Sequence, residues 1–180
     1  MSTSTGFRLL VADLVKRPGA ARSVVVDAPL GDLPVGGSRL VGDGTIHLEL
    51  DLERILEGLV VRGTIAADWV GSCGRCLRAV EGHLVVGVDE LFEREPVEGE
   101  TYLLEHDEID LEPLARDAIG LELPLVPLCR SDCAGLCPEC GIDRNESACE
   151  CARDTSDPRW AALSSLHFAD RDVPDERAPN

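Results

Sequence analysis

Eight cysteines, spaced as two sets of four, constrain this 180-residue chain more than any other feature. Four thiolates make the closed tetrahedral site of structural zinc. The chain shows no export signal or apolar run long enough to cross a membrane, so we expect a cytoplasmic location. In a reducing compartment, metal ligation is favoured over disulfides. The candidate ligands are Cys73, Cys76, Cys129, Cys133, Cys137, Cys140, Cys149 and Cys151.

Spacing alone leaves open which cysteines share a metal, and whether one or two zinc ions bind. The preferred partition places in one site Cys73, Cys76, Cys129 and Cys133. It places in the other Cys137, Cys140, Cys149 and Cys151. A rival partition joins the first CxxC pair to Cys137 and Cys140, leaving the other four together. In either case an all-thiolate site leaves no open position for catalysis.

Other thiol chemistries fit the spacing less well. Thioredoxin-like sites place CxxC at a strand–helix junction, whereas Cys73-x2-Cys76 lies between two strand-like segments. An iron–sulfur cluster accepts four thiolates, but the spacings match no ferredoxin pattern. The run from Cys137 to Gly141 is typical of a zinc knuckle, since glycine permits the left-handed residue of its turn.

Hydrophobic alternation predicts an α+β fold with a twisted, barrel-like antiparallel sheet. The predicted strands are 7–12, 23–27, 45–52, 59–70 and 81–92. One main helix is predicted at 109–123, with Asp110 as its N-cap and Pro113 in its first turn.

The domain organisation follows from these elements. We expect a β-rich domain at 1–128, and a cysteine-rich zinc-binding segment at 129–168 packed on it. A short second helix is expected from Asp157 to Leu166, and a disordered tail at 169–180.

The chain is strongly acidic, with 34 acidic against 17 basic residues and a net charge of −17. Nucleic-acid affinity comes mainly from Lys and Arg, so a broad grip on RNA is disfavoured. Residues 89–112 hold 11 acidic residues and one arginine. This stretch is interpreted as a solvated acidic loop or, alternatively, as a docking surface for a basic partner. Weak candidates for contact with RNA or a partner are Arg8, Lys16, Arg17, Arg22, Arg75 and Arg78, which alternatively only offset the acidic surface.

No group of residues supports an enzyme. The four histidines show no paired metal spacing, and neither a nucleophile elbow nor a glycine-rich phosphate loop is present. Trp69 and Trp160 are predicted to anchor the core. We therefore expect neither catalysis nor a small-molecule substrate.

The segment PLVPLCRSDCAGLCPECG, followed by a CxC and by DPRWAALSSL, resembles the YceD family, named for large ribosomal RNA subunit accumulation. The resemblance extends upstream through the CxxC hairpin and the predicted helix, over roughly residues 7–168. It implies a cytoplasmic bacterial protein needed for accumulation or processing of large-subunit ribosomal RNA. It assigns no catalytic residues, and it carries over the cysteines only as metal ligands.

The acidity of the chain qualifies this expectation. A factor with this charge is expected to act through a basic protein partner, such as a ribosomal protein or a nuclease, or within a pre-ribosomal particle. Direct RNA contact is then weak. Two alternatives stay open: a zinc-containing regulatory adaptor and a thiol-redox sensor.

Overall fold

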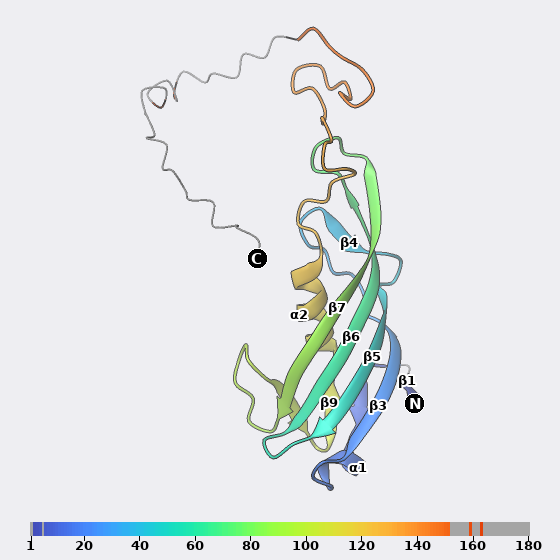
Figure 1. Cartoon of the computed structure of the whole chain (residues 1–180), viewed down its shortest axis with the longest axis vertical. Coiled ribbons are helices and arrows are strands. Elements are labelled where there is room, and N and C mark those ends of the chain that lie inside the picture. The colour runs from blue at the N-terminus through green and yellow to red at the C-terminus, as the bar shows by residue number, and fades with distance from the viewer. Residues whose placement is uncertain (1, 5, 152–158, 160–162, 164–180) are drawn as a thin grey trace, which may run out of the picture.

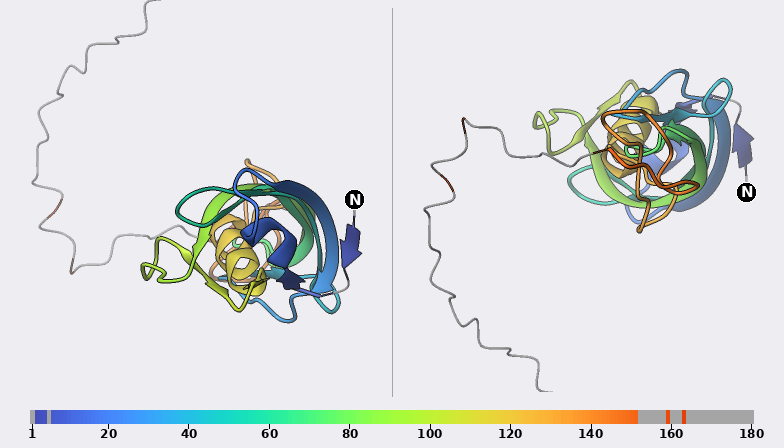
Figure 2. Two further views of the ribbon diagram at one scale, coloured as in Figure 1. Left: turned by 90° about the horizontal axis from the view of Figure 1, so that it is seen from below. Right: turned by 90° about the horizontal axis from the view of Figure 1, so that it is seen from above.

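A nine-stranded sheet curls around one helix, α2, and makes up most of the molecule (Figures 1 and 2). This computed structural model of the whole chain describes residues 2–4, 6–151, 159 and 163. The elements are β1 (Ser2–Ser4), β2 (Arg8–Leu10), α1 (Ala12–Val15), β3 (Ala21–Pro29), β4 (Ser38–Leu40), β5 (Thr45–Arg54), β6 (Leu59–Ser72), β7 (Ala79–Glu93), β8 (Tyr102–Glu105), β9 (Glu108–Asp110) and α2 (Glu112–Glu122).

The strand order is β1-β3-β5-β6-β7-β8-β9-β2, and β4 pairs with β6 off this path. Only β1 with β3 and β7 with β8 pair in parallel. All the other strand pairs are antiparallel. The predicted α+β fold with a curled, barrel-like antiparallel sheet is therefore confirmed.

The concave face of the sheet carries the core because side chains alternate strictly between its two faces. In β5 the inward residues Ile46, Leu48, Leu50 and Leu52 are all buried. Each contributes about 1.5–3 kcal/mol when it leaves water. Their neighbours on β6 include Val61, also buried. This face was predicted from the alternation alone.

Helix α2 fills the concave side with three buried residues, Leu114, Ala115 and Ile119. It begins at Glu112, so the prediction of a start at 109 is wrong. Ile109 instead pairs with Leu9 in the sheet. The carboxylate of Asp110 still accepts a hydrogen bond from the Glu112 backbone N–H at 2.9 Å, so it stabilises the first turn from outside the helix.

The structure corrects other boundaries. The predicted strand at 7–12 is the short β2, and Ala12 instead begins α1. The other four predicted strands are present and extend further. Four short strands were not predicted, because three or four residues are too few to show a period: β1, β4, β8 and β9. Trp69 packs against the core as expected. Trp160, the expected 157–166 helix and the expected tail lie outside the described residues. No helix in the described ranges combines the length and apolarity that crossing a membrane requires.

Glycine permits the tight curl at the centre of β6. Gly63 has φ +151°, and a Cβ added there would lie 2.0 Å from the carbonyl oxygen of Glu49 on the neighbouring strand. Gly87 on β7 has open space at the Cβ position. The two glycines therefore differ in what an added methyl group would meet.

We expect Gly63→Ala to lower the free energy of unfolding by roughly 2–4 kcal/mol, through backbone strain and a clash that the paired strand cannot relieve. Gly87→Ala is the matched control, and alanine in an open strand position is expected to be neutral or stabilising by about 0.5–1 kcal/mol. Urea unfolding followed by circular dichroism measures both. Equal changes in the free energy of unfolding for the two substitutions would contradict the interpretation that the curl of β6 depends on a glycine at residue 63.

Candidate metal centres

The structure gathers all eight cysteine sulfurs into two groups of four. Within each group the Sγ atoms lie within 4.8 Å of one another. The first group is Cys73, Cys76, Cys129 and Cys133. The second group is Cys137, Cys140, Cys149 and Cys151. This is the preferred partition, and the rival partition is not seen.

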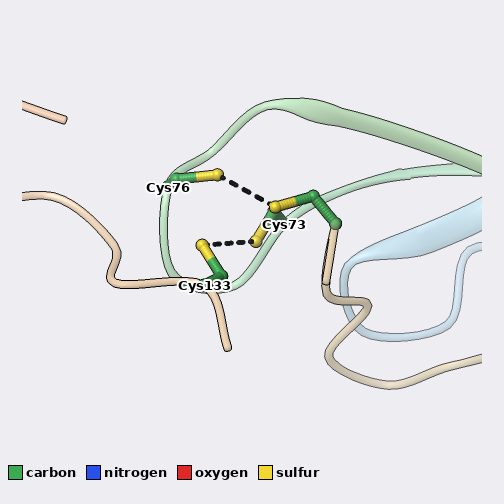
Figure 3. Close-up of side chains that lie close together, drawn as sticks. Cys73, Cys76 and Cys133 are labelled. Carbon is green, nitrogen blue, oxygen red and sulfur yellow. Dashed lines mark hydrogen bonds between the residues drawn. The ribbon is translucent and has the colours of Figure 1, made fainter. Parts of the chain in front are cut away.

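The spacing of the sulfurs in the first group suits a tetrahedral metal. Cys73 Sγ lies 3.9 Å from Cys133 Sγ, and Cys76 Sγ lies 3.6 Å from Cys129 Sγ. Four thiolates about 2.3 Å from a tetrahedral ion would be about 3.8 Å apart, whereas a disulfide needs about 2.05 Å. Figure 3 shows the side chains of Cys73, Cys76 and Cys133 pointing toward one another. These residues therefore fit a structural zinc ion.

Each group is built on a knuckle with the same backbone hydrogen bonds. In the first, the N–H of Cys73 donates to Arg78 O at 2.8 Å, and the N–H of Leu77 donates to Cys73 O at 2.9 Å. In the second, Cys137 donates to Ile142 O at 2.8 Å, and Gly141 donates to Cys137 O at 2.9 Å. Two CxxC turns far apart in the sequence thus present their sulfurs in the same way.

The first group stabilises a thiolate at Cys73. Backbone N–H groups of Cys129, Cys76 and Arg75 bond to this sulfur and lower the pKa of Cys73 to about 6. Burial and the neighbouring thiols raise the pKa of Cys129 to about 12. One thiolate therefore forms readily, and the remaining thiols release protons when a cation binds among them.

The second group repeats this pattern. Backbone N–H groups of Cys140 and Glu139 lower the pKa of Cys137 to about 6. Hydrogen bonding with Cys140, together with burial, raises the pKa of Cys151 to about 12. The Arg144 guanidinium bonds to the sulfur of Cys137, which raises the pKa of that arginine.

The segment that follows α2 buries few side chains. Between 128 and 151 the only side chains that are buried belong to Cys133 and Cys137. Cys73, Cys76 and Cys133 form a small core of their own, with Val80 and Leu136 against it. Since this segment has so little apolar burial, metal ligation by the cysteines would supply folding free energy to it.

Asn145 links the two groups, and the sequence interpretation missed it. Its Nδ2 donates to Cys133 Sγ at 3.4 Å, although Asn145 lies in the loop of the second group. Its Oδ1 accepts from the backbone N–H of Ala134 at 2.8 Å. Asp143, which accepts from Asn145, also pairs with Arg78 of the first knuckle at 2.7 Å. The only available signal was a pair of Asx residues between cysteines, which is too common to assign.

The six basic candidates do not form one surface. Arg8, Lys16, Arg17 and Arg22 lie around β2, α1 and the start of β3, at the opposite end of the sheet from the β6–β7 knuckle that carries Arg75 and Arg78 (Figure 1).

Most of these side chains bind within the chain. Arg22 pairs with Asp13 at 3.1 Å, and Arg78 pairs with Asp143. Arg75 donates to Cys133 O at 2.9 Å. Arg8 lies 3.5 Å from Glu108. No ion pair involves Lys16 or Arg17 within the described ranges.

The acidic 89–112 stretch is not one solvated loop, so that interpretation is wrong for most of it. Its first residues belong to β7, and β8 and β9 occupy its second half. Only the middle matches the expectation, since residues 94–100 are all exposed. Most acidic side chains outside residues 94–100 therefore project from strands of the sheet.

A curled antiparallel sheet bearing two four-cysteine groups defines a class of small β-rich proteins with structural metal sites. The chain belongs to the YceD family, because residues 61–167 match the family described as large ribosomal RNA subunit accumulation protein YceD. An uncharacterized protein of Mycobacterium tuberculosis is 39% identical over 165 residues, which cover 87% of this chain and 79% of that protein.

More distant relatives also match. The chloroplastic YCED homolog 1 of Arabidopsis thaliana, a large ribosomal RNA subunit accumulation protein, is 24% identical over 195 residues, covering 89% of this chain and 58% of the homolog. The uncharacterized protein YlbN of Bacillus subtilis is 31% identical over 108 residues, covering 57% and 63% respectively. No solved structure matches the chain significantly.

We expect two zinc ions per chain, with Cys133→Ser and Cys149→Ser each removing one, because serine is a poor zinc ligand of similar size. Zinc released by a thiol reagent and counted with a chromophoric chelator gives the stoichiometry. Retention of both ions by either variant would contradict the assignment of that group. Visible absorption typical of an iron–sulfur cluster in the purified protein would show that the cysteines hold a cluster rather than zinc.

Leu77 occupies the left-handed position of the first knuckle with φ +61°, where the second knuckle has Gly141 at +73°. The Leu77 side chain is exposed, so no buried apolar surface offsets the backbone strain. We expect Leu77→Gly to raise the free energy of unfolding by up to about 1 kcal/mol, and the reciprocal Gly141→Ala to lower it by a similar amount. Urea unfolding of the zinc-loaded protein measures both. Destabilisation by Leu77→Gly would show that the leucine side chain makes a stabilising contact.

Proposed function

We propose that this protein is a non-enzymatic factor of the cytoplasm that promotes accumulation or processing of large-subunit ribosomal RNA. The observation that carries the proposal is membership of the YceD family, whose description names this role. The Arabidopsis relative carries the same description in its name. The two four-cysteine groups would hold zinc as structural ions, since four thiolates leave no position for a substrate or a reactive water.

The protein acts through a basic protein partner, and it touches RNA weakly. A net charge of −17 repels polyphosphate, and the arginines near the metal centres are engaged within the chain. A ribosomal protein, a nuclease or another protein of a pre-ribosomal particle carries the opposite charge that this surface attracts. Electrostatic steering of this kind speeds encounter and selects against other acidic proteins.

We expect a strain lacking this protein to accumulate less mature large-subunit than small-subunit ribosomal RNA, with restoration by the wild-type gene. Quantitative RNA analysis of the two subunits measures this. In parallel, tagged protein is recovered from its own cytoplasm with and without ribonuclease, and proteins and RNA are identified. Basic ribosomal proteins or a nuclease that persist after ribonuclease support the partner mechanism.

Three results would contradict the proposal in different ways. An unchanged ratio of subunit RNAs would remove the ribosomal role. A second result is ultraviolet crosslinking of precursor RNA directly to this chain, together with loss of all protein partners after ribonuclease. It would show that the protein binds RNA rather than acting through a protein partner. Recovery of RNA polymerase or a regulator without ribosomal material would favour the adaptor alternative.

A further inference from the structure

One edge of β7 is free over most of its length. On one side β7 pairs with β6 from Ala79 to Phe92. On the other side only Phe92 and Glu93 pair, with β8. Within the described part of the chain, no other backbone hydrogen bond involves residues 79–91. Over residues 79–91, β7 is therefore an edge strand whose outward-directed N–H and C=O groups can bond to a further strand.

This edge opens onto a groove between β7 and α2. The groove has a volume of about 720 Å³ and is lined by both elements and by residues 99–102. Val86 and Val88 of β7 and Leu114 and Ala118 of α2 supply an apolar lining. The apolar groove and the free edge are thus continuous.

The charges that line the groove are predominantly acidic. They come from Glu90, Glu100, Asp117 and Glu122. Arg116, the one basic residue of the lining, pairs with Glu112 at 2.9 Å and donates to Leu30 O at 2.6 Å. Partial burial and the carboxylates of Asp89 and Asp117 raise the pKa of Glu90. A cation placed here would relieve this repulsion.

We propose that the free edge of β7 binds an extended, basic segment of a partner protein by strand addition, with alternate Lys or Arg side chains lying in the groove. Strand addition derives affinity from backbone hydrogen bonds and specificity from the pockets of alternate side chains. The inward side chains of an added strand share the face of Val86, Val88 and Glu90. A lysine or arginine there would lay its aliphatic stem on the valines and its charge beside Glu90 and Asp117.

The same carboxylates select against other occupants. A second copy of β7 would bring a second Glu90 to the same face, and inward-pointing charges are a known defence against edge pairing. The chain's own residues 152–180 hold six acidic and four basic residues, so they lack the required charge. This inference rests on the proposed basic partner and specifies where and how it binds.

The test uses the full zinc-loaded chain and a labelled peptide of about nine residues with lysine at every second position and threonine or valine between. We expect binding, with slowed hydrogen exchange of those 79–91 amides that point away from β6. The double variant Glu90→Gln, Asp117→Asn should weaken binding about tenfold. Asparagine retains the oxygen that accepts from the Tyr102 hydroxyl. The matched control Asp32→Asn, Glu57→Gln, equal in charge change but outside both the groove and β7, should leave binding within about twofold.

Two further peptides separate strand addition from simple attraction. N-methylation of alternate backbone nitrogens keeps the charge and removes the strand hydrogen bonds, so it should abolish binding. A peptide with the same lysines grouped together should bind more weakly. Equal binding of the N-methylated peptide, or an unaffected double variant, would overturn the proposal. Slow exchange in the free protein of those 79–91 amides that point away from β6 would also overturn it, because the edge would already be covered by this chain or a second copy.

The same double variant keeps this inference separate from the proposed function. If it recovers ribosomal partners as well as wild type does, docking at β7 is wrong and the proposed function stands. If wild type recovers no ribosomal material but binds the peptide at β7, the ribosomal role is wrong and the docking surface stands. Slowed exchange of the outward-pointing amides at 79–91 on addition of an RNA oligonucleotide alone would identify RNA as the occupant and overturn the protein partner.

Discussion

The β6–β7 hairpin pairs without interruption from Leu59 with Phe92 to Ser72 with Ala79, and this register positions the main features of the molecule. Its tip carries Cys73 and Cys76, so the first metal centre stands at the end of the longest ladder in the sheet. Its concave side supplies the residues that α2 covers. Its outer edge is left free beside that helix. A shift of β7 by one residue against β6 would turn its inward-facing side chains outward and change the turn that carries Cys73 and Cys76.

Different interactions stabilise the two halves of the molecule. The sheet and α2 bury a continuous aliphatic core, and this accounts for the region before residue 124. Between residues 128 and 151 the segment after α2 buries only cysteine side chains, so the two four-cysteine groups take the place of a core there. The first centre joins both halves, because two of its sulfurs come from the hairpin and two from the segment after α2. The position of that segment therefore depends on the sheet as well as on the metal.

The sequence predicted those features that repeat over many residues or involve rare residue types. Strict alternation in 45–52 revealed a strand and its buried face, and the cysteine spacing suggested the two groups that the structure brings together. Three-residue strands such as β9 leave no period, so Ile109 was assigned to the helix that follows it. The link through Asn145 depends on the position of a loop relative to Cys133, and no local pattern encodes such a position. Long-range placement, rather than element type, was the missing information.

The fold places part of the acidic charge of the chain at defined positions. The sequence shows that residues 89–112 are rich in acidic side chains, but it does not show where those side chains lie. In the structure, Glu90 is held on the inward face of β7 and faces Asp117 of α2 across an apolar floor. Carboxylates fixed in this way lose little further entropy when a cation binds, whereas those on the exposed 94–100 loop must first be ordered. The fold thus turns part of a diffuse negative charge into a preorganised site, and in the function that we propose this is the site where a strongly acidic chain holds a basic protein.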